Sequence, residues 1–220
     1  MEPINLGTKV LDHPVILHHL AIIRDKYTDS NRFRDSIKKI SEFLFYDATE
    51  NLPTRTVEIE TPLCKTEGYM LTDDGNVFVS TIMRAGIIML EAAANIIPNA
   101  IFQHLGMYRD ESTCKPVWYY NRLPDKFKDP ENIILYICDP MLATGGTACE
   151  AIKLYKNKGI GEENITFLSV ISAPTGMEKI RDNFPDVRMI TASLDSHLNE
   201  KGYIVPGLGD AGDRIFNTLY

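Results

Sequence analysis

Hydrophobic residues in the first 50 positions recur at the spacing of an α-helix. In the segment HPVILHHLAIIRDK the apolar positions fall on one helical face, and Asp12 stands where an N-cap belongs. A second stripe advances in steps of four, three and four residues after the turn YTDSN, with Ser30 as its N-cap: Phe33, Ile37, Ile40 and Leu44. The pattern predicts that residues 1–50 form a helical N-terminal section.

The pattern changes after residue 50. Residues 56–63, TVEIETPL, alternate as an exposed or half-buried strand does, and short β-rich or apolar runs then alternate with helical stretches. The run IILYIC has the continuous apolar character of a parallel strand that is buried on both faces. Such alternation predicts an α/β core over residues 77–194, a mostly parallel sheet flanked by helices. Residues 110–132, long, polar and aromatic, favour a projecting loop or hairpin.

The composition fits one domain that spans residues 1–220, with 44% hydrophobic residues. A net charge of −7 argues against nucleic acid as a partner, although a locally positive cleft can still bind a small anion. The four cysteines form no C-x-x-C pair, and we expect them to be reduced thiols. The sequence shows neither a secretory signal nor an apolar run of membrane-spanning length. We therefore expect a cytoplasmic protein without a membrane partner.

The strongest local signal is the segment ILYICDPMLATGGTACEAI. A buried strand ends at Cys138, Asp139 follows at its carboxyl end, and residues 144–147 (TGGT) lead into a helix. The unpaired N–H groups at a helix start attract oxyanions, and glycines let the backbone approach them closely. The alternative is a plain strand-to-helix turn with threonine caps. No Gly-Lys-Ser/Thr follows, so the loop is not a Walker loop, and a single terminal phosphate is the favoured ligand.

Several uncommon strings give the chain a resemblance to a known family. DPMLATGGT, MRAGIIML, GMYRDESTCKPVWYYNRLP and YIVPGLGDAGDR resemble segments of the uracil phosphoribosyltransferases, which are type I phosphoribosyltransferases. The resemblance covers nearly the whole chain. It implies a type I phosphoribosyltransferase fold with a projecting β-arm and a small C-terminal base-binding hood, residues 195–220.

The resemblance also implies which residues bind phosphoribosyl diphosphate (PRPP). They are Arg84, Arg109, Asp139, Pro140, Met141, Leu142, Ala143, Thr144, Gly145, Gly146, Thr147 and Asp210. Many type I enzymes carry a second acid after the first and another before Thr-Gly, where this chain has Pro140 and Ala143. Asp139 remains to hold the ribose hydroxyls, directly or through magnesium. Ala143 cannot act as a base, so the general base stays unidentified.

Near its C-terminus the chain contains Gly207, Gly209 and Gly212, the G-x-G-x-x-G spacing of dinucleotide-binding proteins. Only DRIFNTLY follows, which leaves no room for the acid that such a site needs about 20 residues further on. Two interpretations remain: a structural loop of tight turns, or a loop whose backbone groups recognise a base. The family resemblance implies the second, with uracil bound by Tyr203, Ile204, Gly209, Asp210 and Ala211.

In that interpretation the carbonyl of Ile204 faces N3–H of uracil, and the amides of residues 209–211 face its oxygens. Cytosine would leave those groups unpaired, at about 1–3 kcal/mol each. In the same interpretation, the side chain of Asp210 extends towards the ribose and diphosphate of bound PRPP.

Two arginines are candidates for binding the diphosphate. Arg84 ends an apolar strand, and Arg109 precedes the long loop; their planar guanidinium groups suit phosphate oxygens. By analogy with type I enzymes we expect a cis peptide bond at Arg84–Ala85. Residues 115, 118 and 119 lie in the long loop, which is a candidate lid over PRPP or an arm that packs on another subunit.

The resemblance implies transfer of the 5-phosphoribosyl group from PRPP to N1 of uracil, which gives UMP and pyrophosphate. The catalytic residues would be Asp139, Asp210, Arg84 and Arg109. Mg²⁺ would be held mainly by PRPP, with Asp139 as the candidate side chain for direct contact. Uracil and PRPP would be the partners, in a homodimer or homotetramer, and GTP activation stays open. The alternatives are an RNA-binding regulator, which needs a basic face, and a catalytically silent relative, which needs a damaged motif.

Overall fold

The computed structural model describes residues 8–72, 75–109 and 116–218, and it is built around one large sheet. The strand order is β1-β10-β9-β7-β4-β5-β6, and β8 pairs with β9 beside this path. All these pairs are parallel except the pair of β5 and β6. The mostly parallel sheet is therefore confirmed. The bounds are β1 (Thr8–Val10), β4 (Val77–Met83), β5 (Ile101–Arg109), β6 (Pro116–Asn121), β7 (Ile134–Cys138), β8 (Met141–Leu142), β9 (Ile165–Ser172) and β10 (Arg188–Leu194).

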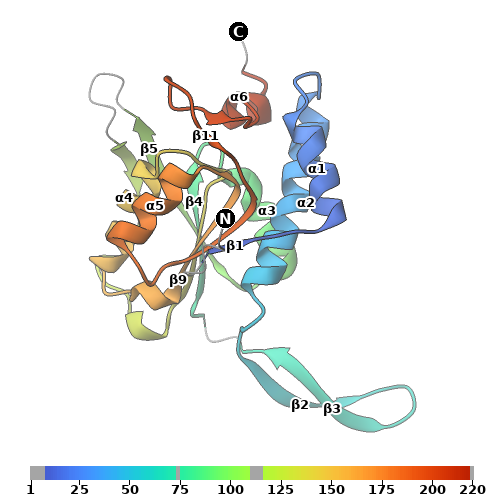
Figure 1. Ribbon diagram of the computed structural model, residues 1–220. Helices are drawn as coiled ribbons and strands as arrows, with labels where there is room; N and C mark the ends of the chain where they lie inside the picture. The colour runs from blue at the N-terminus through green and yellow to red at the C-terminus, as the bar shows by residue number, and fades with distance from the viewer. Residues whose placement is uncertain (1–7, 73–74, 110–115, 219–220) are drawn as a thin grey trace.

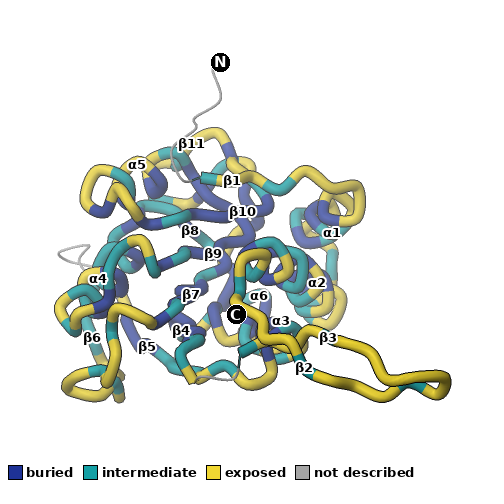
Figure 2. The backbone as a smooth tube through the Cα atoms, turned by 90° about the horizontal axis from the view of Figure 1, so that it is seen from below, coloured by how far each residue is buried: buried dark blue, intermediate teal, exposed yellow. Residues whose placement is uncertain are grey.

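Helices cover both faces of this sheet (Figure 2). One layer contains α1 (Pro14–Arg24), α2 (Ser30–Ala48) and α3 (Ile87–Ile96); the other contains α4 (Gly146–Lys156) and α5 (Pro174–Asn183). Short 3₁₀ turns lie at η1 (Pro130–Asn132) and η2 (Glu162–Asn164). The side chains form two buried clusters, one for each face. The interior strands are buried almost throughout, which explains their continuous apolar runs.

The caps of the first two helices lie one residue from the predicted positions. His13, not Asp12, caps α1, and its Nδ1 accepts a hydrogen bond from the backbone N–H of Val15. Asp29, not Ser30, caps α2 and accepts from the N–H groups of residues 31 and 32. Both segments contain adjacent side chains that can accept, and the turn geometry selects between them.

A two-stranded hairpin projects from the body of the molecule (Figure 1). It consists of β2 (Thr54–Glu60) and β3 (Lys65–Leu71), paired in an antiparallel ladder. This is the projecting arm, and it lies elsewhere in the chain than the loop or hairpin predicted at residues 110–132. Residues 116–121 instead form β6 at the edge of the main sheet, where Trp118 packs against a buried cluster. Residues 110–115 lie outside the described part of the chain.

The C-terminal segment lies at the opposite end of the molecule from the arm (Figure 1). It contains the two-stranded ladder of β11 (His197–Leu198) and β12 (Ile204–Val205), followed by α6 (Ala211–Phe216). Ile204, Leu208 and Ile215 join the buried cluster formed with α1 and α2. This segment has the place expected of the hood. Within the described ranges, no helix combines the length and apolar character needed to cross a membrane.

Candidate active site

The loops that follow the parallel strands meet at one edge of the sheet. β4 and β7 are parallel neighbours, with Thr81 opposite Cys138, so the segments that begin at Arg84 and Asp139 lie side by side. An added Cβ on Gly86 would lie 2.7 Å from the carbonyl oxygen of Cys138, which shows how closely the two loops approach. Ligands of open α/β sheets bind at this carboxyl edge.

The predicted phosphate loop has the geometry that close approach to an anion requires. Gly145 has a φ of +72°, in the left-handed region, and α4 begins at the next residue. A Cβ on Gly145 would lie 2.8 Å from the carbonyl oxygen of Gly176, at the start of α5. Gly176, which the sequence analysis did not single out, is equally confined, since its Cβ would lie 2.6 Å from the carbonyl oxygen of Ala143.

This loop encloses a cavity of about 160 Å³. Its lining comprises most of the residues predicted to bind PRPP, together with two neighbours: Asp139, Met141, Leu142, Ala143, Thr144, Gly145, Gly146, Thr147, Ala148 and Phe167. Pro140 is buried, and its carbonyl oxygen accepts from the N–H groups of Val170 and Ile171, so this residue anchors the loop to β9.

Asp139 has unusual electrostatics for a carboxyl group at a surface cavity. Part of the residue reaches solvent, yet the surrounding chain packs closely around the carboxyl group. Desolvation raises its pKa to about 7, although a hydrogen bond from the N–H of Met141, at 3.3 Å, acts in the opposite direction. The neutral form of this carboxyl group is therefore favoured more than in an ordinary aspartate, and a cation beside it would favour the charged form.

Two of the three C-terminal glycines have backbone conformations that favour glycine. Gly207 and Gly209 have φ values of +58° and +82°, and the peptide bond between Val205 and Pro206 is cis. Ile204 and Ala211 are buried, whereas Tyr203, Gly209 and Asp210 are exposed.

The N-cap of α6 is Asp210, which accepts a hydrogen bond from the N–H of Asp213 at 2.9 Å. This contact fixes the local turn.

Arg84 connects the loop that follows β4 with the C-terminal segment. Its guanidinium group lies 3.4 Å from the carboxylate of Asp213 and remains largely exposed. The predicted cis bond at Arg84–Ala85 is wrong, because the cis bond is Met83–Arg84. Arg109 ends β5, but its side chain lies outside the described part of the structure, as does Lys115.

The sequence analysis missed an ion pair beneath the C-terminal segment. Arg24, the last residue of α1, donates to both carboxylate oxygens of Asp195, at 2.8 and 2.6 Å. Burial by itself would raise the pKa of Asp195, but hydrogen bonds from Arg24, the Gly207 N–H and Ser193 outweigh it and hold the pKa below its ordinary value. The sequence signal for this pair was an acid, Asp195, directly after an apolar strand. Its partner Arg24 lies 171 positions away, so the pairing itself could not be predicted.

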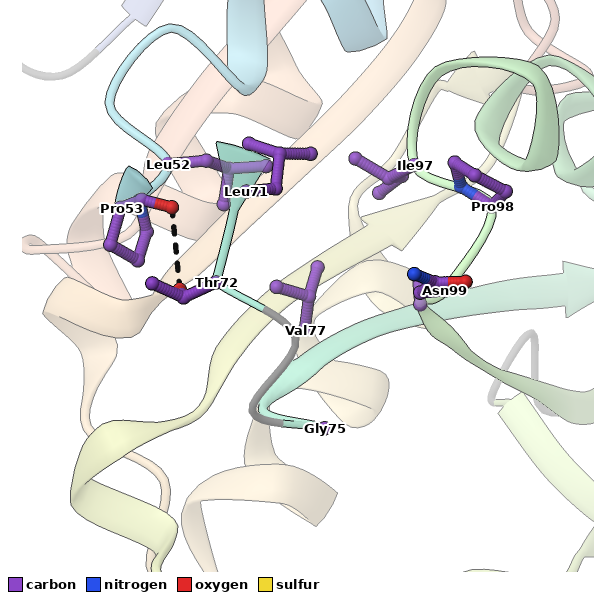
Figure 3. A pocket seen from close by; sticks show the side chains of 10 residues that line it. Leu52, Pro53, Leu71, Thr72, Gly75, Val77, Ile97, Pro98 and Asn99 are labelled. Atoms are coloured by element: carbon purple, nitrogen blue, oxygen red, sulfur yellow. Dashed lines mark hydrogen bonds between the residues drawn. The ribbon is translucent and has the colours of Figure 1, made fainter. Parts of the chain in front are cut away.

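A second cavity, of about 100 Å³, lies at the root of the projecting arm (Figure 3). Apolar side chains such as Leu52, Leu71, Val77 and Ile97 surround it. Val77 begins β4, so this cavity faces the edge of the sheet opposite to the glycine loop. Its apolar lining and position separate it from the site described above.

The pattern of one protein family, described as uracil phosphoribosyltransferase, matches residues 10–218. This chain belongs to the uracil phosphoribosyltransferase family. It is 46% identical to the uracil phosphoribosyltransferase of Dictyoglomus turgidum over 209 residues, which cover 95% of this chain and 98% of the relative. It is 47% identical to that of Limosilactobacillus reuteri over 210 residues, which cover 96% and 98%.

Solved structures agree with this family membership. A protein from Aquifex aeolicus is 33% identical and superposes with a TM-score of 0.85, over 95% of this chain and 97% of the other. Adenine phosphoribosyltransferase from Leishmania donovani is 16% identical, with a TM-score of 0.54 over 91% and 89% of the two chains, and shares the fold. The type I phosphoribosyltransferase fold is thus confirmed. The uracil phosphoribosyltransferase family match includes the glycine loop, Arg84 and the C-terminal segment.

Proposed function

We propose that this chain transfers the 5-phosphoribosyl group from PRPP to N1 of uracil and releases UMP and pyrophosphate, as its family membership indicates. The observation that best supports the proposal is the glycine loop with a left-handed Gly145, placed beside the partly buried Asp139 at the carboxyl edge of the sheet. Such a loop suits the terminal phosphate of PRPP, and the adjacent carboxylate suits its ribose hydroxyls.

In the proposed mechanism the protein holds the two substrates in line. Uracil lies against the backbone of residues 204–211, and PRPP lies between the glycine loop and Arg84. The bond from ribose C1 to the diphosphate loosens, and N1 of uracil attacks from the opposite face. Arg84 and Arg109 stabilise the negative charge that develops on the leaving diphosphate, while Asp210 positions the ribose side. No covalent intermediate with the protein is needed.

Magnesium fits this site as a substrate-bound ion. Mg²⁺ prefers oxygen ligands and commonly binds through one carboxylate together with substrate phosphates. Asp139 offers one such carboxylate at the cavity, and the described residues contain no group of three His, Cys, Asp or Glu side chains able to hold a metal. Bound with PRPP, the ion would offset diphosphate charge. Asp139 is the residue that would contact it.

We further propose that the chain assembles as a homodimer or homotetramer through the arm. An isolated two-stranded hairpin is marginally stable in water, yet this one extends apolar side chains into solvent, with Leu63 95% and Tyr69 75% exposed. A second copy of the chain would cover them. Activation by GTP and a cytoplasmic location stay predictions.

The decisive experiment compares four bases. Purified protein is incubated with PRPP, Mg²⁺ and uracil, cytosine, hypoxanthine or orotate, and nucleotide formation is followed. We expect product from uracil alone. Product from another base would contradict the assignment of residues 203–211. If PRPP binds but no product forms, GTP is added, and continued inactivity would contradict the proposed reaction.

Variants of the proposed acids test the site itself. We expect Asp139→Asn and Asp210→Ala each to lower kcat/KM by about a hundredfold while circular dichroism stays unchanged, since both would misplace the ribose. Glu58→Gln, on the exposed arm, is the matched control and should retain full activity. Full activity in both acid variants would remove these residues from the mechanism.

A further inference from the structure

The loop assigned to uracil is held from below by a single ion pair. Asp195 follows β10 and is 6% exposed, and Arg24 ends α1. One oxygen of Asp195 accepts from the backbone N–H of Gly207 at 2.7 Å, and Arg24 donates to the carbonyl oxygen of Gly207 at 2.9 Å. Both polar backbone groups of Gly207 are therefore bound by one acid and one base.

Gly207 is in turn in close contact with the carbonyl assigned to the base. An added Cβ on Gly207 would lie only 2.1 Å from the carbonyl oxygen of Ile204, so the backbone of Gly207 packs closely against that oxygen. Ile204 lies opposite Leu198 in the antiparallel ladder, and the neighbouring position is hydrogen-bonded from the N–H of Asn199 to the carbonyl of Tyr203. Hydrogen-bonded and non-bonded pairs alternate in such ladders, so the Ile204 carbonyl points away from β11.

The same acid is fixed to the central sheet by a chain of hydroxyl groups. Ser193 donates to Asp195 at 2.8 Å, and Arg24 donates to the hydroxyl of Ser193 at 3.0 Å. The chain continues through Thr191, which donates to the carbonyl of Ser193, to Ser172 on β9. These hydrogen bonds fix the position of Gly207 relative to the buried strands of the sheet and not relative to the exposed part of its own loop.

We propose that Arg24 and Asp195 are positioning residues for uracil, which set the Ile204 carbonyl and the following amides before the base binds. Neither side chain touches the base; both act through Gly207. The inference rests on the proposed assignment of residues 204–211 to uracil. Preorganisation of this kind lowers the cost of binding, so its loss weakens uracil affinity and leaves PRPP affinity intact.

The test compares the KM for uracil with the KM for PRPP in variants of this ion pair. In Asp195→Asn one oxygen can still accept hydrogen bonds, but the other is replaced by an NH2 group that cannot accept, and the charge that holds Arg24 is lost. We expect the KM for uracil to rise about tenfold, with kcat and the KM for PRPP within about twofold of the parent. Ser193→Ala, which removes one hydrogen bond from each partner, should shift the same parameter about threefold. The ratio of kcat/KM for uracil to kcat/KM for cytosine should fall in parallel. A displaced Ile204 carbonyl accepts a weaker hydrogen bond from N3–H of uracil and so discriminates less between the two bases.

The matched control is Tyr155→Phe. Its hydroxyl makes buried hydrogen bonds to Ser80 and Gln103, both at 2.7 Å, on the other face of the sheet. This variant should lower the unfolding midpoint without changing the KM for uracil. If Asp195→Asn behaves like Tyr155→Phe, or if it changes both KM values equally, the positioning role is overturned.

A loop variant distinguishes failure of this inference from failure of the assigned uracil site. Gly209 has a φ of +82° and open space around it, so Gly209→Ala strains the loop without a clash. If Gly209→Ala raises the KM for uracil but Asp195→Asn does not, the loop binds uracil and the ion pair does not position it. If neither variant changes that KM, the assignment of the loop itself is wrong, and the positioning role is overturned with it.

Discussion

Single residues decide the shape of the glycine loop. Gly145 and Gly75 both have φ values in the left-handed region, at +72° and +64°. Their surroundings differ, because a Cβ on Gly145 would meet the backbone of Gly176 and a Cβ on Gly75 would meet nothing within 4 Å. The two positions therefore separate backbone strain from close packing.

We expect Gly145→Ala to lower kcat/KM for PRPP by about a hundredfold, because the loop must move away from α5 and loses its alignment with the phosphate. Gly75→Ala should cost about 1 kcal/mol of stability, from backbone strain alone, and leave kcat/KM unchanged. Steady-state kinetics with varied PRPP and urea unfolding measure the two effects. Equal losses of activity in both variants would contradict the role given to the contact with Gly176.

The second residue-scale prediction concerns Asp139 and pH. Because burial raises its pKa to about 7 from the ordinary 3.8 of an aspartate, the folded state keeps a proton that the unfolded state releases between these two values. The contribution of Asp139 to the free energy of unfolding should therefore be most favourable below about pH 4 and be lost as the pH rises through 7. Asn at position 139 does not ionise, so Asp139→Asn avoids this loss of stability. We expect the variant to gain about 1–3 kcal/mol over the parent between pH 4 and pH 8, less than the full shift corresponds to because the residue is partly exposed.

Urea unfolding of both proteins across this pH range, without PRPP or metal, measures the difference. A constant difference between the two proteins would show that Asp139 is ionised throughout. Together with the expected loss of activity, a gain in stability would show that the partly buried carboxylate of Asp139 serves function and lowers the free energy of unfolding.

At the scale of elements, periodicity predicted most of the fold. The interior strands are buried on both faces, so their apolar runs were visible in the sequence. The arm was misplaced because residues 56–63 and residues 116–121 both have strand character. Only pairing with β5 separates the edge strand β6 from a free hairpin, and that pairing is not local. The glycine loop was predictable because it is contiguous; the Arg24–Asp195 pair joins distant residues and was not.

The arm carries the element-scale prediction. Leu63 and Tyr69 are among its most exposed apolar side chains, and the proposed assembly would bury them. We expect Leu63→Asp combined with Tyr69→Glu to lower the oligomeric state, because each charge would have to be desolvated in the interface. Light scattering after gel filtration measures the mass. Tyr27→Glu, at a side chain 82% exposed on the body of the molecule, is the control and should leave the mass unchanged. An unaltered mass in the double variant would exclude the arm as the interface.

At the scale of the whole molecule, the two ends of the chain form one unit. Arg214 on α6 donates to the carbonyl oxygens of Ile23, Asp25 and Leu208, and its guanidinium group lies 4.2 Å from the ring centre of Phe33. Arg34 on α2 donates to the carbonyl of Ile215 at 2.8 Å. The helical N-terminal section and the C-terminal segment therefore support each other, although almost the whole sequence separates them.

This mutual support predicts a single cooperative unfolding transition for the described body of the protein. Loss of the Arg214 side chain leaves backbone carbonyls without their partner and removes the contact with Phe33, so Arg214→Ala should cost about 2–4 kcal/mol. Far-ultraviolet circular dichroism reports the helices, and fluorescence of Trp118, the single tryptophan, reports β6 on the far side of the sheet. We expect the two curves to coincide in the parent and to shift together in Arg214→Ala. An early loss of helical signal, with the Trp118 transition unmoved, would show that the two ends form a separate unit and that residues 1–220 do not unfold as one domain.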